Sequence, residues 1–103
     1  MNRLENKVAI VTGTGDGIGR GIALAFAREG ARLAICDLNV TELRETEQLI
    51  QKTGRQVLAL PIDLRDTSQI SAFEERTAAT FGRIDCLINN AAGYGARGQQ
   101  PTS

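Results

Sequence analysis

Four short apolar runs alternate with three helix-length segments along the chain, and this alternation restricts the possible folds more than any other feature. The runs lack the strict polar–apolar alternation of a half-exposed strand, which is typical of strands buried on both faces of a parallel sheet. A β-α-β-α-β-α-β order implies right-handed crossovers. We therefore predict an α/β fold: a Rossmann-like doubly wound parallel sheet, truncated, with strand order 3-2-1-4 and three helices. The runs are residues 8–11, 33–36, 57–60 and 86–88.

Between the runs, apolar residues recur at helical spacing. Each segment ends near a glycine (Gly30, Gly54 and Gly82), which suits the left-handed conformation that closes many helices because glycine has no Cβ to clash. The third helix can begin at Asp66 or Thr67, since either side-chain oxygen can accept a hydrogen bond from the first turn. The residues expected on the buried helix faces are Ile18, Ile22 and Phe26, then Leu43, Thr46 and Ile50, then Ile70, Phe73, Thr77 and Phe81.

A glycine-rich segment, Thr-Gly-Thr-Gly-Asp-Gly-Ile-Gly at positions 12–19, joins the first strand to the first helix. A strand that turns at once into a helix needs residues that tolerate positive φ, and a diphosphate that approaches the backbone needs side chains out of the way. The exposed N–H groups and the helix dipole then favour an anion. A tight turn without a ligand is the alternative, but it needs fewer glycines. The segment predicts a nucleotide-binding loop.

The spacing of the glycines discriminates between kinds of nucleotide loop. A P-loop would end in Gly-Lys-Ser/Thr, whereas Arg20 and Gly21 follow this loop. The G-x-G-x-x-G fingerprint, begun at Gly13, would require glycine where Ile18 stands. The remaining pattern is Thr-Gly-x3-Gly-x-Gly, followed downstream by an acidic residue.

With this pattern the chain resembles the short-chain dehydrogenase/reductase family, from about residue 6 to residue 93. The resemblance implies an NAD(P)-dependent oxidoreductase that transfers a hydride between nicotinamide and an alcohol or ketone. Asp37 follows the second strand close to the spacing at which an acidic residue meets the adenosine ribose. Its carboxylate can accept hydrogen bonds from both ribose hydroxyls and would repel a 2′-phosphate, and neither Leu38 nor Asn39 adds positive charge. Asp16 stands where NADP-preferring relatives often carry a base, so NAD is expected rather than NADP.

Two further segments extend the resemblance. Asp63 and Leu64 match the pair that holds the adenine in the family, by a hydrogen bond and by packing on the ring. Residues 89–93, Asn-Asn-Ala-Ala-Gly, resemble the family's Asn-Asn-Ala-Gly, whose asparagines tie strand ends together and whose backbone touches the ribose; Ala92 replaces the usual glycine. Read alone, the two segments would be a helix-entry loop and a turn. The cofactor-binding residues predicted are Gly13, Thr14, Gly15, Asp16, Gly17, Ile18, Gly19, Asp37, Leu38, Asp63, Leu64, Asn89 and Ala91.

The catalytic residues of the family have no counterpart in this chain. Family chemistry uses a tyrosine, with a lysine four residues later that lowers the tyrosine pKa, and a serine. Here Tyr94 is the only tyrosine, Gly98 stands four residues later, and histidine is absent. We predict no catalytic residue, and no activity for the chain alone. Residues 1–93 are interpreted as an NAD-binding half domain and residues 94–103 as a polar tail that is truncated. The alternative is a stand-alone nucleotide-binding or interaction module without catalysis. A methyltransferase is a weaker alternative.

Composition narrows the possible partners. The 12 Lys and Arg balance the 12 Asp and Glu, so no basic face is expected for nucleic acid, and the apolar runs are too short to span a membrane. Cys36 and Cys86 lack metal-ligand spacing and are interpreted as buried thiols in a reducing, cytoplasmic compartment. The expected partner is the dinucleotide cofactor. A homo-oligomer is expected for a full-length parent, and self-association for this chain.

Overall fold

The computed structural model describes residues 3–15 and 17–90. The seven elements follow one another in the predicted order, and the strands begin and end within about one residue of the apolar runs. The fold-class prediction is confirmed. The elements are β1 (Val8–Thr12), α1 (Gly17–Arg28), β2 (Arg32–Asp37), α2 (Val40–Lys52), β3 (Val57–Pro61), α3 (Thr67–Phe81) and β4 (Cys86–Ile88).

The four strands form one parallel sheet in the predicted order β3-β2-β1-β4. In the register of the sheet, Val11 of β1 lies between Ile35 of β2 and Ile88 of β4. All five residues of β1 are buried, because strands flank it on both sides and helices cover both faces. The strands all point the same way, so their carboxyl ends meet along one edge of the sheet.

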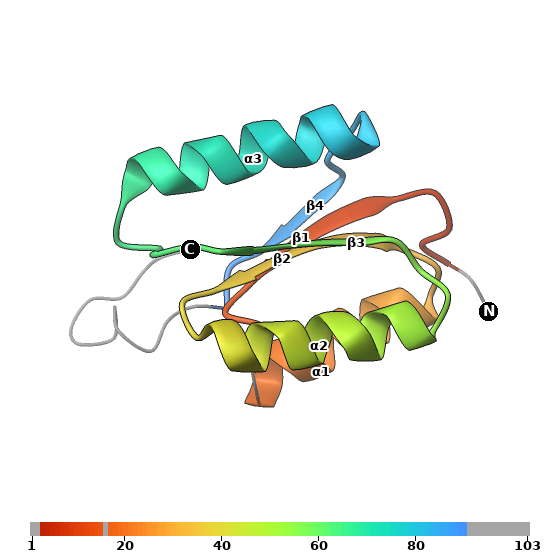
Figure 1. The fold of residues 1–103 in the computed structure, drawn as a ribbon. Helices are drawn as coiled ribbons and strands as arrows, with labels where there is room; N and C mark the ends of the chain where they lie inside the picture. Colours follow the sequence, from red (N-terminus) through yellow and green to blue (C-terminus); the bar gives the residue numbers. More distant parts are fainter. Residues whose placement is uncertain (1–2, 16, 91–103) are drawn as a thin grey trace.

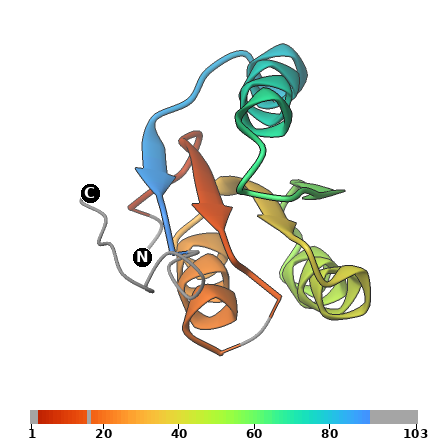
Figure 2. The same ribbon diagram turned by 90° about the vertical axis from the view of Figure 1, so that its left-hand side faces the viewer.

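Helices cover the two faces unequally, with α1 and α2 on one face and α3 on the other (Figure 1, Figure 2). The side with two helices encloses the larger apolar core, which includes Leu33, Ile35, Leu43 and Ile50. The side covered by α3 encloses a smaller cluster around Phe73. This is the division of helices that right-handed crossovers require.

The buried face of α2 confirms the sequence prediction. The prediction for α3 holds for Phe73 and Thr77, whereas Ile70 and Phe81 are half-buried. The buried face of α1 corrects the prediction in part. Ile18 is 76% exposed. The buried residues of α1 are Gly19, Ala23 and Ala27, and Ile22 packs only partly against the core. Small side chains let α1 lie close to the sheet, so the buried stripe runs one position beyond the large residues that the apolar pattern emphasised.

Helix ends follow the expected chemistry. Gly82 closes α3 in the left-handed conformation and donates its N–H to the carbonyl of Ala78, 2.7 Å away. Of the two candidate caps for α3, the structure selects Asp66, whose carboxylate accepts the N–H of Ser68 at 3.0 Å. Asn39 caps α2 in the same way, a role that the sequence analysis did not assign.

Both cysteines are free thiols. Cys36 is fully buried, and this burial raises the pKa of its thiol to about 12. Cys86 is half-buried, so the expected burial holds in full only for Cys36. Among the described helices, none has both the length and the apolar character needed to cross a membrane.

Candidate cofactor-binding site

The glycine loop, residues 13–19, leaves the carboxyl end of β1 and enters α1. Gly13 and Gly17 adopt φ values of 66° and 57°, which side chains disfavour. The N–H groups of Gly13 and Thr14 both donate to the carbonyl of Cys36, at 3.0 and 3.2 Å, and so bend the loop toward β2. A Cβ at Gly17 would meet nothing within 4 Å, so the backbone there lies open.

Gly19 allows the first turn of α1 to pack against the start of the loop. A Cβ at this position would lie 1.9 Å from the Gly13 carbonyl oxygen and 2.7 Å from Nδ2 of Asn90. Neither neighbour can give way cheaply, because one is backbone and the other is hydrogen-bonded to that same carbonyl at 3.2 Å. The glycine at position 19 is therefore required by the packing itself.

Asp37 ends β2 beside the glycine loop. One carboxylate oxygen accepts the N–H of Gly15 at 2.8 Å, and the other accepts the N–H of Asn39 at 2.9 Å. A Cβ on Gly15 would lie 2.9 Å from the first of these oxygens. The bare backbone at Gly15 is what brings loop and carboxylate together. Leu38, the next residue, is 60% exposed.

Asn89 and Asn90 tie the end of β4 to the end of β1. The Thr12 hydroxyl donates to Oδ1 of Asn89 at 3.0 Å and accepts the N–H of Asn90 at 2.9 Å. The Asn90 side chain donates to the carbonyl of Gly13. The strand-tying role that the resemblance implied for these asparagines is confirmed. Thr12 is the shared partner, which sequence reasoning placed in the loop without a role.

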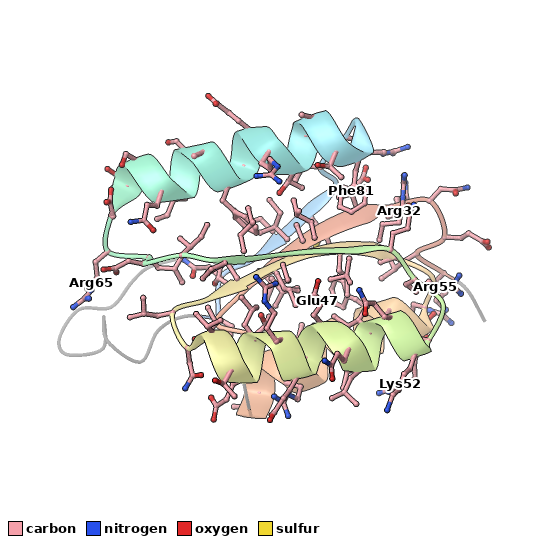
Figure 3. The ribbon with its side chains drawn as sticks, in the orientation of Figure 1. Arg32, Glu47, Lys52, Arg55, Arg65 and Phe81 are labelled. Atoms are coloured by element: carbon pink, nitrogen blue, oxygen red, sulfur yellow. The ribbon has the colours of Figure 1, made fainter. Side chains whose placement is uncertain are left out.

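Asp63 and Leu64 follow β3 at the same edge of the sheet. The Arg65 guanidinium donates two hydrogen bonds of 3.0 Å, one to each oxygen of the Asp63 carboxylate. This hydrogen-bonded guanidinium, with the Arg65 N–H, lowers the pKa of the Asp63 carboxyl. Leu64, Thr12 and Asn89 line a pocket of about 200 Å³. Figure 3 places Arg65 at the end of the sheet opposite to Phe81.

Hydrogen bonds bring the predicted residues together to different degrees. The glycine loop contacts both Asp37 and Asn90 directly. The Asp63 segment is joined to Asp37 through the backbone, where the N–H of Ile62 donates to the Asp37 carbonyl at 3.2 Å. Two predicted residues, Asp16 and Ala91, lie outside the described residues, as do Tyr94 and the tail. Within the described part of the chain, no group of three or more His, Cys, Asp or Glu residues could hold a metal ion.

Sequence reasoning missed two residues behind the loop. Arg20 of α1 and Thr46 of α2 both bind backbone carbonyls of the loop. Thr46 was expected on the buried face of its helix, where a hydroxyl needs a partner. A threonine on a buried helix face could therefore have been identified as a hydrogen-bond donor rather than as part of the apolar core.

Comparison with known protein families gives a match over nearly the whole chain: the family model for short chain dehydrogenases matches residues 7–103. The chain belongs to the short-chain dehydrogenase family. This short-chain dehydrogenase chain is 43% identical over 91 residues to an uncharacterized oxidoreductase of Bacillus subtilis. It is 37% identical over 95 residues to a 7alpha-hydroxysteroid dehydrogenase of Escherichia coli.

These alignments cover 88% and 92% of this chain but 33% and 37% of the two relatives, so the chain spans about a third of their length. Among solved structures, a short chain dehydrogenase from Mycobacterium paratuberculosis bound to NAD superposes with a TM-score of 0.84 at 29% identity. That match covers 86% of this chain and 38% of the other. The similarity therefore concerns one part of a longer chain in each of these relatives.

Proposed function

We propose that this chain supplies the dinucleotide-binding part of an NAD-preferring oxidoreductase, which transfers a hydride between nicotinamide and an alcohol or ketone. One observation carries the proposal: the Asp37 carboxylate lies against an open glycine loop at the amino end of α1. An anion and a ribose diol are the two groups that such a pairing of N–H donors and carboxylate accepts.

The residues fit a dinucleotide. The bare backbone at Gly17 leaves room for a diphosphate at the start of α1, where the helix dipole favours negative charge. Each Asp37 oxygen accepts one backbone N–H, and an ionised carboxylate has about four acceptor positions, so capacity remains for the two ribose hydroxyls. The adenine is assigned to Asp63 and Leu64, and the remaining ribose contacts to Asn89 and Ala91.

The preference for NAD over NADP follows from charge. A 2′-phosphate next to Asp37 would bring two anions together, at the edge of the loop that also carries Asp16. The nearest sequence neighbours of Asp37 are uncharged, and the Arg65 guanidinium is already paired with Asp63. The NAD-bound relative from Mycobacterium paratuberculosis supports the cofactor class.

We assign the catalytic residues to another part of the parent enzyme. Bound NAD would supply the hydride acceptor, and the residues of this chain would hold and orient it. The Tyr-x3-Lys pair that moves the proton in the family is not in this sequence, and the curated relatives are about three times as long. We place the cofactor-binding half domain at residues 1–93, with 94–103 as a tail, and the location in the cytoplasm, consistent with two free thiols.

Calorimetric titration of the chain with NAD, NADP and ADP tests the proposal. We expect NAD to bind at least tenfold more tightly than NADP, and ADP to share part of the NAD affinity because it contains the adenosine and diphosphate. A stand-alone interaction module would bind none of the three. A preference for NADP would overturn the assignment of Asp37.

A further inference from the structure

We propose that Thr46 and Arg20 are positioning residues, which hold the carbonyl groups of the glycine loop away from the cofactor so that no carbonyl oxygen faces the diphosphate. The inference rests on the proposed function and deepens it, because neither residue belongs to the predicted cofactor-binding set. Both residues bind carbonyl groups of the loop from the side where α1 and α2 pack against each other.

Thr46 lies in the middle of α2 and is fully buried. Its hydroxyl is 2.6 Å from the carbonyl oxygen of Thr14, but 3.2 Å from that of Glu42 and 3.4 Å from that of Gly15. A hydroxyl has one proton to donate, and the shortest contact takes it to Thr14. The hydrogen bond therefore joins α2 to the loop rather than only to the preceding turn of its own helix.

Arg20 completes the support from the first turn of α1. Its Nε donates to the Thr46 hydroxyl at 2.8 Å, and its Nη2 donates to the carbonyls of Gly15 and Glu42 at 2.5 and 3.1 Å. Glu45 pairs with the same nitrogen at 3.3 Å. One guanidinium thus links α1, α2 and the loop in a planar fork that lysine cannot reproduce.

The arrangement gives the loop a defined polarity. The carbonyls of Thr14 and Gly15, two consecutive residues, are both bound on the side that faces α2. The N–H that shares a peptide unit with the Thr14 carbonyl is that of Gly15, and it donates to Asp37 at 2.8 Å. Bound on both sides in this way, the loop has a fixed direction for its carbonyl groups. An anion site depends on that direction, because a carbonyl turned toward the diphosphate would repel it.

The chain offers a matched control for Thr46. Thr77 is also a fully buried helical threonine, but it lies on α3, on the other face of the sheet, and donates to the carbonyl of Phe73 in its own helix at 2.8 Å. Thr46→Val and Thr77→Val remove the same hydroxyl from equally buried positions. Only the first removes support from the loop, and Thr46→Ser restores the hydroxyl there.

Two readouts on the full chain separate this inference from the proposed function. The first is NAD affinity by calorimetry, where we expect Thr46→Val to weaken binding about tenfold, Thr46→Ser to recover most of it, and Thr77→Val to leave it unchanged. The second needs no cofactor: amide hydrogen exchange at Gly13, Thr14 and Gly15 should quicken in Thr46→Val and not in Thr77→Val. If the wild-type chain fails to bind NAD, the proposed function falls, and the exchange measurement still decides the inference.

Variants of Arg20 test whether this residue positions the loop or only attracts the diphosphate by its charge. Arg20→Lys keeps the charge but loses the fork, so we expect it to weaken NAD binding as much as Arg20→Gln does. The effects of Arg20→Gln and Thr46→Val should also be less than additive, because both break one network. Wild-type affinity in Arg20→Lys, or loop exchange rates in Thr46→Val that match those of Thr77→Val, would overturn the inference.

Discussion

The N–H of Gly15 donates a 2.8 Å hydrogen bond to the carboxylate of Asp37, and this contact joins the two parts of the candidate site. Gly15 belongs to the glycine loop and Asp37 to the end of β2, 22 residues later. A side chain at position 15 would crowd the carboxylate, since its Cβ would lie 2.9 Å from the bonded oxygen. The loop and the acidic residue are thus one recognition unit.

Removing the charge from Asp37 should weaken NAD binding and reduce the difference in affinity between NAD and NADP. A hydrogen bond to a charged group contributes about 1.5–3 kcal/mol, so Asp37→Asn should weaken NAD binding about tenfold or more. Calorimetric titration with both cofactors measures the change. Glu75→Gln, which removes an exposed charge on α3, serves as the control. Equal NAD affinity in Asp37→Asn and the wild type would refute the assignment of the ribose to this carboxylate.

Two helical glycines should respond in opposite ways to alanine. At Gly19 the new Cβ would lie 1.9 Å from the Gly13 carbonyl oxygen, so Gly19→Ala should destabilise the chain and abolish NAD binding. At Gly21 nothing lies within 4 Å, so Gly21→Ala should stabilise α1 by about 1 kcal/mol through helix propensity. Urea unfolding followed by circular dichroism measures both. A Gly19→Ala chain as stable as the wild type would contradict the close packing of Gly19 against Gly13.

The order of strands and helices could be predicted because each strand is an apolar run and each helix end carries a glycine. The buried face of α1 could not, because Gly19, Ala23 and Ala27 give a weak apolar signal beside Ile18. Small residues pack a helix closely without raising its hydrophobicity. The pattern therefore identified the helix but not the face that it buries.

The site could be predicted where residues lie in one motif or at a characteristic spacing from it, as Asp37 does from the glycine loop. The glycine loop and the asparagines after β4 are such motifs, and the Asp63–Arg65 ion pair joins residues two apart, so its spacing was readable in principle. The contact of Arg20 with Thr46 joins residues 26 positions apart on two helices. Its existence depends on how α1 and α2 pack on the sheet, which no local pattern specifies.

Acid should destabilise the chain partly through Asp85. Its carboxylate accepts hydrogen bonds from Arg83 and from the N–H of Val8, and these lower its pKa below the ordinary 3.8. The charged form is favoured by folding, so the stabilisation is present above pH 3.8 and is lost as the pH falls through the lowered value. Asp85→Asn should lower stability at neutral pH and flatten its decline in acid. Thermal melts over descending pH test this, and parallel declines in both proteins would refute it.

The chain alone should show no turnover. It lacks the Tyr-x3-Lys pair, and general acid–base transfer of this kind contributes about 10²–10⁴-fold to a rate. Purified chain would be mixed with NAD and a panel of alcohols while the nicotinamide absorbance is followed. Reproducible reduction of NAD that disappears in Gly17→Trp would show that the chain holds catalytic groups of its own.

Self-association should occur through β4. Among the described strands, β4 pairs only with β1, so we expect the backbone groups along its outer edge to pair with another chain. Leu87 of this strand is 55% exposed and lines the same pocket as Leu64, and Ile84 just before β4 is 41% exposed. A lysine at position 87 would place a charge on this edge and should shift the chain toward monomer.

Size-exclusion chromatography with light scattering compares Leu87→Lys with Val40→Lys. The second variant adds the same charge at a position 48% exposed on α2, a helix that packs mainly on β2 and β3. We expect concentration-dependent oligomers for the wild type and Val40→Lys, and monomer for Leu87→Lys. A wild-type monomer with a sharp melt above about 60 °C, near the top of the mesophile range, would show that the open edge is tolerated. Oligomers that persist in Leu87→Lys would place the contact on another surface, because a charge buried on β4 without a partner is too costly to leave that contact intact.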